Sequence, residues 1–305
     1  MCCFQQGNFI GNIFVNNIEE VWSGPLAKKI RQGIITAEPH AHCQILGCPF
    51  YERMDLSTGV ATRDDFPTEL EIDLPSQHCN IGGEHPSPDN PACIMCQRNG
   101  EIYVLPDRTK EICDLLRPYM DRVNSIHIQG VAESFWKGMI FEVVDWLGAK
   151  DHHITTSTNG TLLSDSNRRR FLKYKSSSIT WSLDAGTAAT YKKIRRLDMY
   201  DKVVENLNWY SRMRNPYHQR LQIHNTINLI NINEVEDMVR VAAKAKVDCL
   251  EFNATCGNHW FCVNEHNADE FWRAQQKIIS AANYYGVTCS FLRNLDLGMS
   301  NEHGR

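Results

Sequence analysis

The sequence lacks long apolar runs, a leader and an excess of positive charge. No stretch approaches the 18 consecutive apolar residues of a membrane-spanning helix, and no basic–apolar–small-residue leader opens the chain. The 32 Lys and Arg residues are outnumbered by 36 Asp and Glu residues, which gives a net charge of −4. Nucleic-acid binding depends on phosphate neutralisation by basic side chains, so this class is disfavoured. We therefore expect a soluble, unexported protein located in the cytoplasm.

Cysteine, by contrast, is abundant. The 305 residues include 12 Cys, and an apolar fraction of 42% with seven Trp is enough for a substantial core. In a secreted chain so many cysteines would suggest disulfides, whereas C-x2-C spacing in an unexported chain indicates metal or redox chemistry. The length allows one large α/β domain, or one domain with a small appendage.

Six short stretches have the composition of strands, and helical stretches lie between them. Strands that alternate with helices predict βαβ units and a parallel sheet. Six units are too few for a closed eight-stranded barrel, so we predict a partial (β/α)6 TIM-like barrel over residues 66–305, with a C-terminal capping helix. Ligands of such folds lie at the carboxyl ends of the strands. The expected strands are residues 70–74, 125–130, 152–158, 178–184, 221–228 and 247–254.

Three cysteines, Cys79, Cys93 and Cys96, closely follow the first expected strand and therefore lie at the predicted ligand face. Four thiolates would close a zinc site or saturate an iron–sulfur cluster. Three thiolates on a four-iron cluster leave one iron open for a substrate or cofactor. A zinc site completed by His78 or His85 is the alternative.

The ends of the later strands carry polar motifs in a definite order. They read "QGVAES", "TSTNG", "SLD" followed by "YKKIRR", and "HNTIN". With these motifs, residues 70 to 254 resemble the radical S-adenosylmethionine (SAM) enzymes. The resemblance implies that Cys79, Cys93 and Cys96 hold a [4Fe–4S] cluster and that the amino and carboxylate groups of SAM chelate its open iron. SAM is then split, and the 5′-deoxyadenosyl radical abstracts a hydrogen atom.

The same resemblance assigns SAM contacts. "GVAES" implies that Gly130 and Glu133 contact the amino group, and "SLD" implies that Ser182 contacts the carboxylate. Arg195 would be the charged partner of that carboxylate, because a guanidinium fork suits a carboxylate. In the same way, "TNG" implies a place for Asn159 near the ribose, and "HNTIN" implies a place for Asn225 near the nucleoside.

Two features depart from the family pattern. The spacing is C-x13-C-x2-C instead of C-x3-C-x2-C, and Ala132 and Ser134 replace the second glycine and the proline of the SAM motif. The x2 spacing of Cys93 and Cys96 is retained, so the longer insertion is expected to loop out from the cluster.

Residues 1–55 carry few strand signals. Asn17 can cap a short helix, and Pro25 suits the first turn of a second. The segment resembles SPASM/twitch modules that carry auxiliary iron–sulfur clusters. This resemblance implies an auxiliary [4Fe–4S] cluster, and a small zinc knuckle is the alternative. The candidate ligands are Cys2, Cys3, Cys43 and Cys48.

The stretch 247–254 suggests a mechanism. Period-two alternation puts Cys249 and Glu251 on one face, opposite Leu250 and Phe252, which suit a helical layer. Cys249 would then face the barrel interior. A thiol there can return a hydrogen atom to a carbon radical from the opposite face and invert the carbon. A second cluster is a source of the electron that restores the thiol. The alternative is a small core residue.

In length, cluster regions and Cys249, the chain is similar to aminoglycoside-tailoring radical SAM epimerases of antibiotic biosynthesis. This resemblance implies inversion of C-5‴ of neomycin C to give neomycin B, with an external electron donor of flavodoxin or ferredoxin type. An aminoglycoside is a polycation, so Glu251 and Asp184 are the candidate substrate-binding residues. The alternatives are a peptide-modifying radical SAM/SPASM enzyme and a zinc-binding interaction protein without catalysis.

Overall fold

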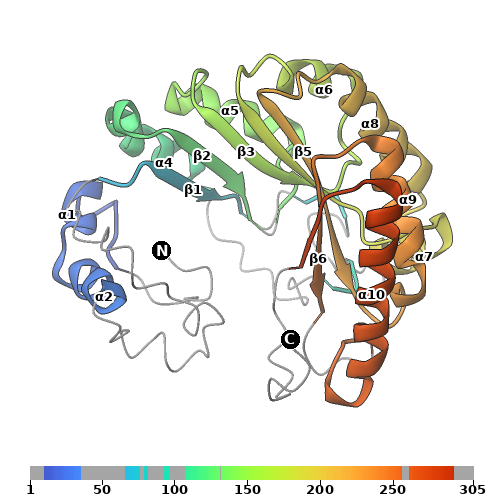
Figure 1. Cartoon of the computed structure of the whole chain (residues 1–305). Coiled ribbons are helices and arrows are strands. Elements are labelled where there is room, and N and C mark those ends of the chain that lie inside the picture. The colour runs from blue at the N-terminus through green and yellow to red at the C-terminus, as the bar shows by residue number, and fades with distance from the viewer. Residues whose placement is uncertain are drawn as a thin grey trace.

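A computed structural model describes residues 10–35, 66–75, 79–81, 93–95, 107–130, 132–255 and 261–291. Its centre is a seven-stranded sheet in which each strand pairs in parallel with its neighbours in sequence, from β1 to β7. The sheet curves so that one face is concave (Figure 1). The strands are β1 (Glu69–Asp73), β2 (Ser125–Gln129), β3 (His153–Thr158), β4 (Ser177–Ser182), β5 (Gln219–Ile227), β6 (Cys249–Ala254) and β7 (Cys289–Phe291).

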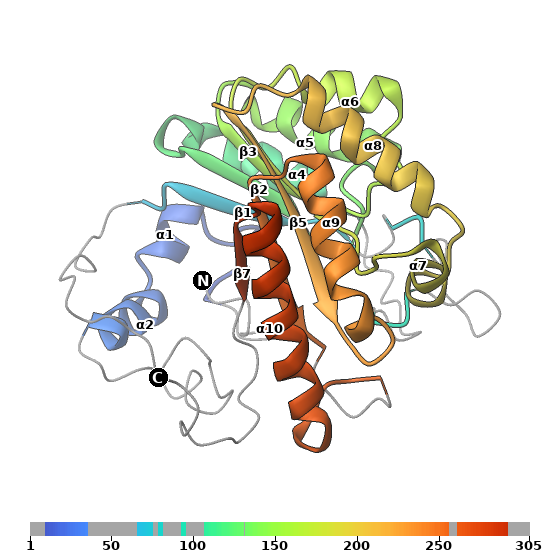
Figure 2. The same ribbon diagram turned by 45° about the vertical axis from the view of Figure 1, so that its right-hand side comes forward.

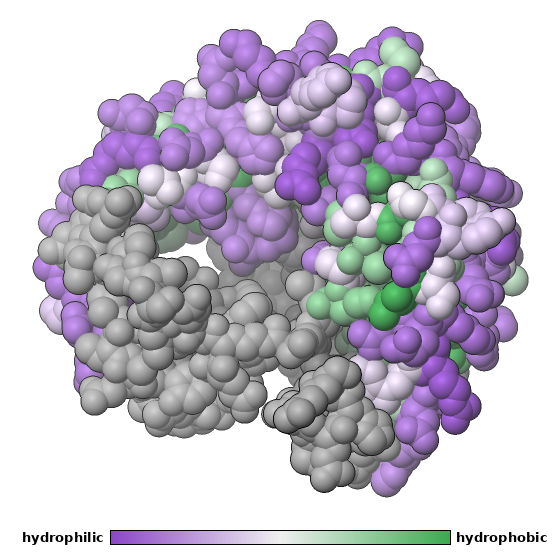
Figure 3. Space-filling view, in the orientation of Figure 1, coloured by the Kyte–Doolittle hydropathy of each residue, from purple (hydrophilic) through white to green (hydrophobic). Residues whose placement is uncertain are grey.

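Helices cover the convex face of the sheet, as Figures 1 and 2 show from two directions. Hydrophilic residues predominate on the outside of this layer (Figure 3). The α/β partial barrel predicted from the sequence is thus confirmed. The main helices are α4 (Thr109–Leu116), α5 (Met139–Leu147), α6 (Asp165–Phe171), α7 (Ala188–Arg195), α8 (Tyr200–Met213), α9 (Val235–Ala245) and α10 (Ala268–Tyr285).

The two faces of the sheet differ in polarity. Ile128, Ile179 and Leu250 point to the helices and are fully buried. On the concave face the alternating positions are half-buried and polar, as at His127 and Gln222. The interior of a closed barrel is normally filled with branched apolar side chains. Here the polar interior indicates a water-accessible binding surface.

The seventh strand was not predicted. We expected the chain after residue 254 to form only a cap, whereas β7 follows α10 and pairs with β6. Phe291 stacks on Phe252 with ring centroids 5.8 Å apart. A three-residue strand is too short for a periodic sequence signal, and the edge of β6 supplies its hydrogen bonds.

The described N-terminal part contains α1 (Ile18–Trp22) and α2 (Pro25–Ile35). Asn17 caps α1 in a capping box with Glu20, as its position predicted. Cys2, Cys3, Cys43 and Cys48 lie outside the described residues, and so does the predicted auxiliary cluster. No helix in the described ranges is both long and apolar enough to cross a membrane.

Candidate active site

A cavity of about 400 Å³ opens at the carboxyl ends of β2 to β5. This is the edge at which parallel α/β folds bind ligands. Of the predicted site residues, eight line it: Cys79, Cys93, Gly130, Glu133, Asn159, Ser182, Asp184 and Arg195. The strand order therefore brings together side chains from five separate segments of the chain.

Cys79 and Cys93 face this cavity although the chain between them is long. The Ile94 N–H donates to the Ile194 carbonyl over 3.0 Å, which fixes the Cys93 segment to the end of α7. The Arg195 Nη1 lies 3.7 Å from the Cys93 Sγ. Thiolates, not thiols, bind iron, and a neighbouring cation favours the thiolate. The Cys93 sulfur, beside this cation, therefore fits a thiolate ligand of a cluster. Cys96 lies outside the described residues.

The segment after Cys79 is fixed on the opposite side of the cavity. The Asn80 side chain donates to Thr161 Oγ1 over 2.9 Å and accepts from Asn159 Nδ2 over 3.0 Å. Asn159 belongs to the loop after β3. The cysteine segments are thus held between this loop and α7.

Glu133 is a fully buried carboxylate on the cavity wall. Its Oε1 accepts from Thr158 Oγ1 over 2.7 Å, and its Oε2 accepts from the Asn159 N–H over 2.7 Å. Burial raises the pKa of Glu133 above its usual range, although these hydrogen bonds act in the opposite direction. Among the described residues, the hydrogen-bond donors to Glu133 are hydroxyl and backbone N–H groups and not basic side chains, so this acid suits a cationic group of a ligand.

Gly130 allows the chain to turn into the cavity after β2. Its φ is +122°, and a Cβ there would lie 2.7 Å from the Leu74 carbonyl oxygen. Only glycine adopts this conformation readily and accommodates the close approach to the backbone after β1.

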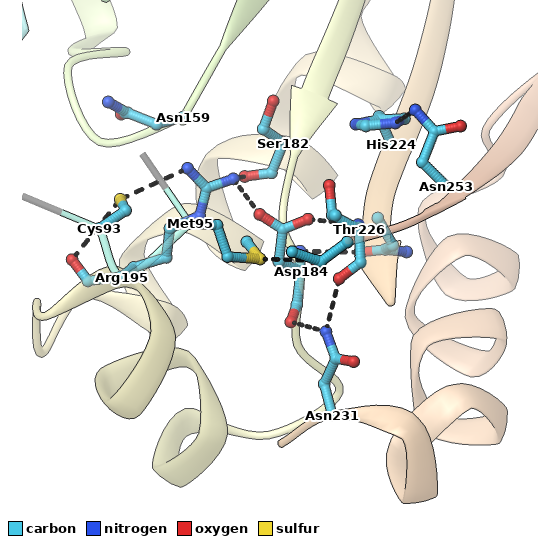
Figure 4. Close-up of polar contacts among 12 residues, drawn as sticks. Cys93, Met95, Asn159, Ser182, Asp184, Arg195, His224, Thr226, Asn231 and Asn253 are labelled. Carbon is cyan, nitrogen blue, oxygen red and sulfur yellow. Dashed lines mark hydrogen bonds and ion pairs between the residues drawn. The ribbon is translucent and has the colours of Figure 1, made fainter. Parts of the chain in front are cut away.

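Arg195 and Asp184 form a buried ion pair beside Ser182 (Figure 4). The Arg195 Nη2 also donates to the Ser182 carbonyl over 3.0 Å. Burial by itself lowers the pKa of Arg195, but the charges of Asp184 and Cys93 outweigh it and raise that pKa. The guanidinium is therefore a fixed positive charge between the Cys93 sulfur and the end of β4.

Asp184 lines the cavity, and both oxygens of its carboxylate have partners within the protein. Its Oδ2 pairs with Arg195 and its Oδ1 accepts from the Thr226 N–H over 2.6 Å. The residue is 2% exposed, and its backbone is left-handed, with φ of 59°. Because both oxygens have partners inside the protein, this geometry orients Arg195 and leaves the prediction of Asp184 as a substrate ligand without further support.

Asn225 lies elsewhere than predicted. It is fully buried on the convex side of β5, and its Oδ1 accepts from the Asp184 N–H over 2.8 Å. Its neighbours His224 and Thr226 line the cavity instead. Successive residues of "HNTIN" point to opposite faces of β5, and the prediction for Asn225 did not include this alternation. Since Leu221, Ile223 and Asn225 share one face of β5, the cavity receives the residues between them.

His224 is a cavity residue that the sequence reasoning missed. Its Nε2 is 2.9 Å from the Asn253 Nδ2 (Figure 4). It pairs in register with Ser182 on β4 and with Glu251 on β6. His224 thus lies between the cavity wall of β4 and the concave face of β6.

Cys249 and Glu251 lie on the concave face, as the alternation predicted, since Leu250 and Phe252 are buried on the other side. Cys249 is the first residue of β6 and pairs with Gln222, two residues before His224. Its Sγ is 3.6 Å from Ser290 Oγ on β7. Cys249 therefore lies deeper in the barrel than the cavity, by about 7 Å at the usual rise of a strand.

Comparison with solved structures found similar folds. The crystal structure of Streptococcus suis SuiB bound to S-adenosylmethionine has a TM-score of 0.53 and 17% identity, covering 74% of this chain and 47% of that chain. SuiB bound to precursor peptide SuiA has a TM-score of 0.54 and 17% identity, covering 74% and 48%. This chain thus matches about half the length of SuiB, and identity at this level shows the fold alone.

Comparison with curated proteins found no match. The model of the Radical SAM superfamily matches residues 79–245, which is more than half of the chain. The match begins at Cys79 and includes the whole cavity wall from Gly130 to Thr226. The chain therefore belongs to the radical SAM superfamily, whose cofactors are a [4Fe–4S] cluster and SAM.

Proposed function

We propose that this protein is a radical SAM epimerase that inverts C-5‴ of the aminoglycoside neomycin C to give neomycin B. The observation that carries the proposal is the position of Cys249. Its thiol lies on the concave face, deeper than the cavity that contains the cysteine segments. A substrate between the two has the cofactor site on one side and a hydrogen-atom donor on the other.

In this proposal, the cysteines bind the cluster, and other cavity residues each bind one particular group of SAM. Cys79, Cys93 and Cys96 hold the cluster. Glu133 binds the SAM ammonium group, and Gly130 lets the backbone approach it. The carboxylate of SAM lies at Ser182 beside the charge of Arg195, and the ribose at Asn159. When bound, the cluster and SAM supply a carbon radical that removes a hydrogen atom from the substrate.

Cys249 completes the inversion. The S–H bond of a thiol is weaker than the C–H bond of a sugar carbon, so transfer of hydrogen from Cys249 to the carbon radical is downhill. Transfer from the side opposite the abstraction gives the inverted carbon. One electron and one proton then restore the thiol. The electron comes from a flavodoxin- or ferredoxin-type donor, directly or through the predicted auxiliary cluster of Cys2, Cys3, Cys43 and Cys48.

The concave face suits an aminoglycoside. Its exposed or half-buried positions include Glu71, Asp73 and Glu251, with hydrogen-bonding groups such as His127 and Gln222 between them. A polyhydroxylated amine needs carboxylates and hydrogen-bonding groups, and a partly enclosed carboxylate binds an ammonium group more strongly than a fully solvated one. Glu251 is the proposed substrate carboxylate, because it pairs in register with His224 of the cavity wall and shares the concave face with Cys249, two residues before it.

A peptide-modifying radical SAM enzyme is the second candidate. One observation favours it, namely the likeness of this fold to SuiB, which has been crystallised with precursor peptide SuiA. A peptide would also suit an open concave face. The two candidates differ in the substrate consumed, so one experiment separates them.

The test is turnover of neomycin C by anaerobically reconstituted protein with SAM and reductant in deuterated water. We expect neomycin B with one deuterium at the inverted carbon, detected by mass spectrometry and NMR. Cys249→Ala should still cleave SAM but form no neomycin B.

Cys289→Ala is the matched control, because Cys289 is a half-buried cysteine on the adjacent strand that packs on the helical side. This variant should retain epimerisation. Unchanged neomycin C with slow SAM cleavage would exclude this substrate and direct the search to other aminoglycosides and to peptides. Full activity of Cys249→Ala would exclude Cys249 as donor.

A further inference from the structure

The helix α7 lies directly against a cluster cysteine. The backbone bond from Ile94 to Ile194 and the contact from Cys93 to Arg195 join its last turn to the Cys93 segment. Figure 4 shows Cys93 beside this end of the helix. A protein bound to the outer side of α7 would therefore be close to the cluster that Cys93 holds.

The outer side of α7 is basic. Its sequence with the C-cap residue, "AATYKKIRR", has four basic residues and no acidic one, in a chain whose net charge is −4. Arg195 points inward to Asp184, whereas Lys192, Lys193 and Arg196 are exposed. These three residues form what we call the α7 basic face.

This basic face is less neutralised than the basic residues on α6 and in the loop after it. Arg169 on α6, for example, lies 2.7 Å from Asp165, and Lys175 lies 2.7 Å from Asp151. Within the described residues, only Lys192 of the α7 basic face forms a salt bridge, with Asp198 at 2.8 Å. One or two cations satisfy the dipole of a helix end, so the additional charges need another explanation.

We propose that the α7 basic face docks the acidic protein that reduces the cluster, an electron donor of the flavodoxin type. The cluster accepts one electron at a time, and electron transfer needs close approach of the two cofactors. Complementary charge steers such an encounter and fixes its orientation. Nucleic acid is a poor alternative occupant, since the chain as a whole is acidic. The inference depends on the cluster and is independent of the substrate.

The test is stopped-flow reduction of the reconstituted cluster by reduced flavodoxin, followed by absorbance and by the electron paramagnetic resonance of the reduced cluster. In Lys192→Glu/Lys193→Glu/Arg196→Glu protein the second-order rate constant should fall by about tenfold or more, and its decrease with added salt should disappear. Reduction by dithionite should stay within about twofold of the unaltered protein, because a small reductant needs no docking surface.

The matched control is Lys150→Glu/Lys175→Glu/Lys244→Glu, which makes the same charge change at exposed positions next to the amino ends of β3, β4 and β6. An equal loss in this control, or no loss in the first variant, would overturn the proposal. If the triple variant fails to hold its cluster, Lys193→Glu and Lys193→Gln alone decide, and only a graded loss of rate with charge supports docking. No step requires an aminoglycoside, so failure here is distinct from failure of the epimerase proposal.

Discussion

The pH dependence of SAM binding should follow one buried carboxyl. Burial raises the pKa of Glu133, and the ionised form is the one that attracts an ammonium group. As the pH falls through this raised pKa the carboxylate gains a proton, so SAM affinity should fall at a higher pH than an ordinary glutamate would give. Equilibrium dialysis of SAM against the reconstituted protein over this pH range measures the effect.

The variant Glu133→Gln provides the comparison. It is neutral at every pH, so its SAM affinity should be weaker by about tenfold, as for the loss of one charge-assisted hydrogen bond, and nearly independent of pH. If the SAM affinity of Glu133→Gln protein kept the pH profile of the unaltered protein, a group other than Glu133 would be responsible for that pH dependence.

The ion pair of Asp184 and Arg195 should contribute strongly to folding stability. Their side chains are 3% and 12% exposed, and Asp184 also accepts from the Thr226 N–H. Removal of one partner from a buried pair leaves an uncompensated charge, so Asp184→Asn should lower the free energy of unfolding by about 3–5 kcal/mol. Denaturant unfolding monitored by circular dichroism measures it.

Asp198→Asn is the control for that experiment. Asp198 pairs with Lys192, but its side chain is 74% exposed. Exposed pairs contribute about 0–1 kcal/mol, so a comparable loss in both variants would contradict a special role for the buried pair.

At the scale of an element, neighbouring residues of β6 are expected to affect different properties, folding stability on one face and substrate binding on the other. Leu250 is fully buried against the helices, whereas Glu251 is half-buried on the concave face. Leu250→Ala should lower the free energy of unfolding by about 2–5 kcal/mol through lost burial and the cavity left behind. Glu251→Ala should change it by less than about 1 kcal/mol and instead weaken substrate binding.

Paired measurements on these two neighbours test the orientation of the strand. The free energy of unfolding comes from denaturant titration and the affinity for neomycin C from calorimetry. A strand rotated by one residue would reverse the two results, because successive side chains point to opposite faces.

At the scale of the whole molecule, the acidic concave face should make substrate binding depend on salt. Glu71, Asp73 and Glu251 lie on this face at or near the two edges of the open sheet. Their attraction for a polycation is screened as the Debye length falls from about 10 Å at 0.1 M to about 3 Å at 1 M salt. We expect the affinity for neomycin C to weaken by about tenfold or more over this range, measured by calorimetry.

An uncharged oligosaccharide of similar size should show no such dependence. Glu251→Gln should reduce both the affinity and its salt dependence, while Glu270→Gln, at an exposed position on α10, should leave both unchanged. Salt-independent binding of neomycin C would mean that hydrogen bonds alone recognise it.

The α/β class, the parallel sheet and most of the cavity residues could be predicted from the order of residues along the chain. Cys79, Gly130 and Asn159 follow the successive strands β1, β2 and β3, Ser182 ends β4, and parallel strands place their carboxyl ends at one edge. The alternation in β6 likewise fixed the faces of Cys249 and Leu250. These features depend on local order along the chain, which a single sequence expresses directly.

The hydrogen-bond and ion-pair partners of these side chains could not be predicted from the sequence. Asp184 reaches Arg195 and the Thr226 N–H across separate elements, and Asn225 turns away from the cavity to hold the Asp184 backbone. β7 forms only because the edge of β6 is present. Hydrogen bonds and ion pairs between distant segments depend on where the packed helices and strands bring them. Residue order along a strand therefore predicted which side chains reach the cavity edge, and packing determined which of them remain available to a ligand.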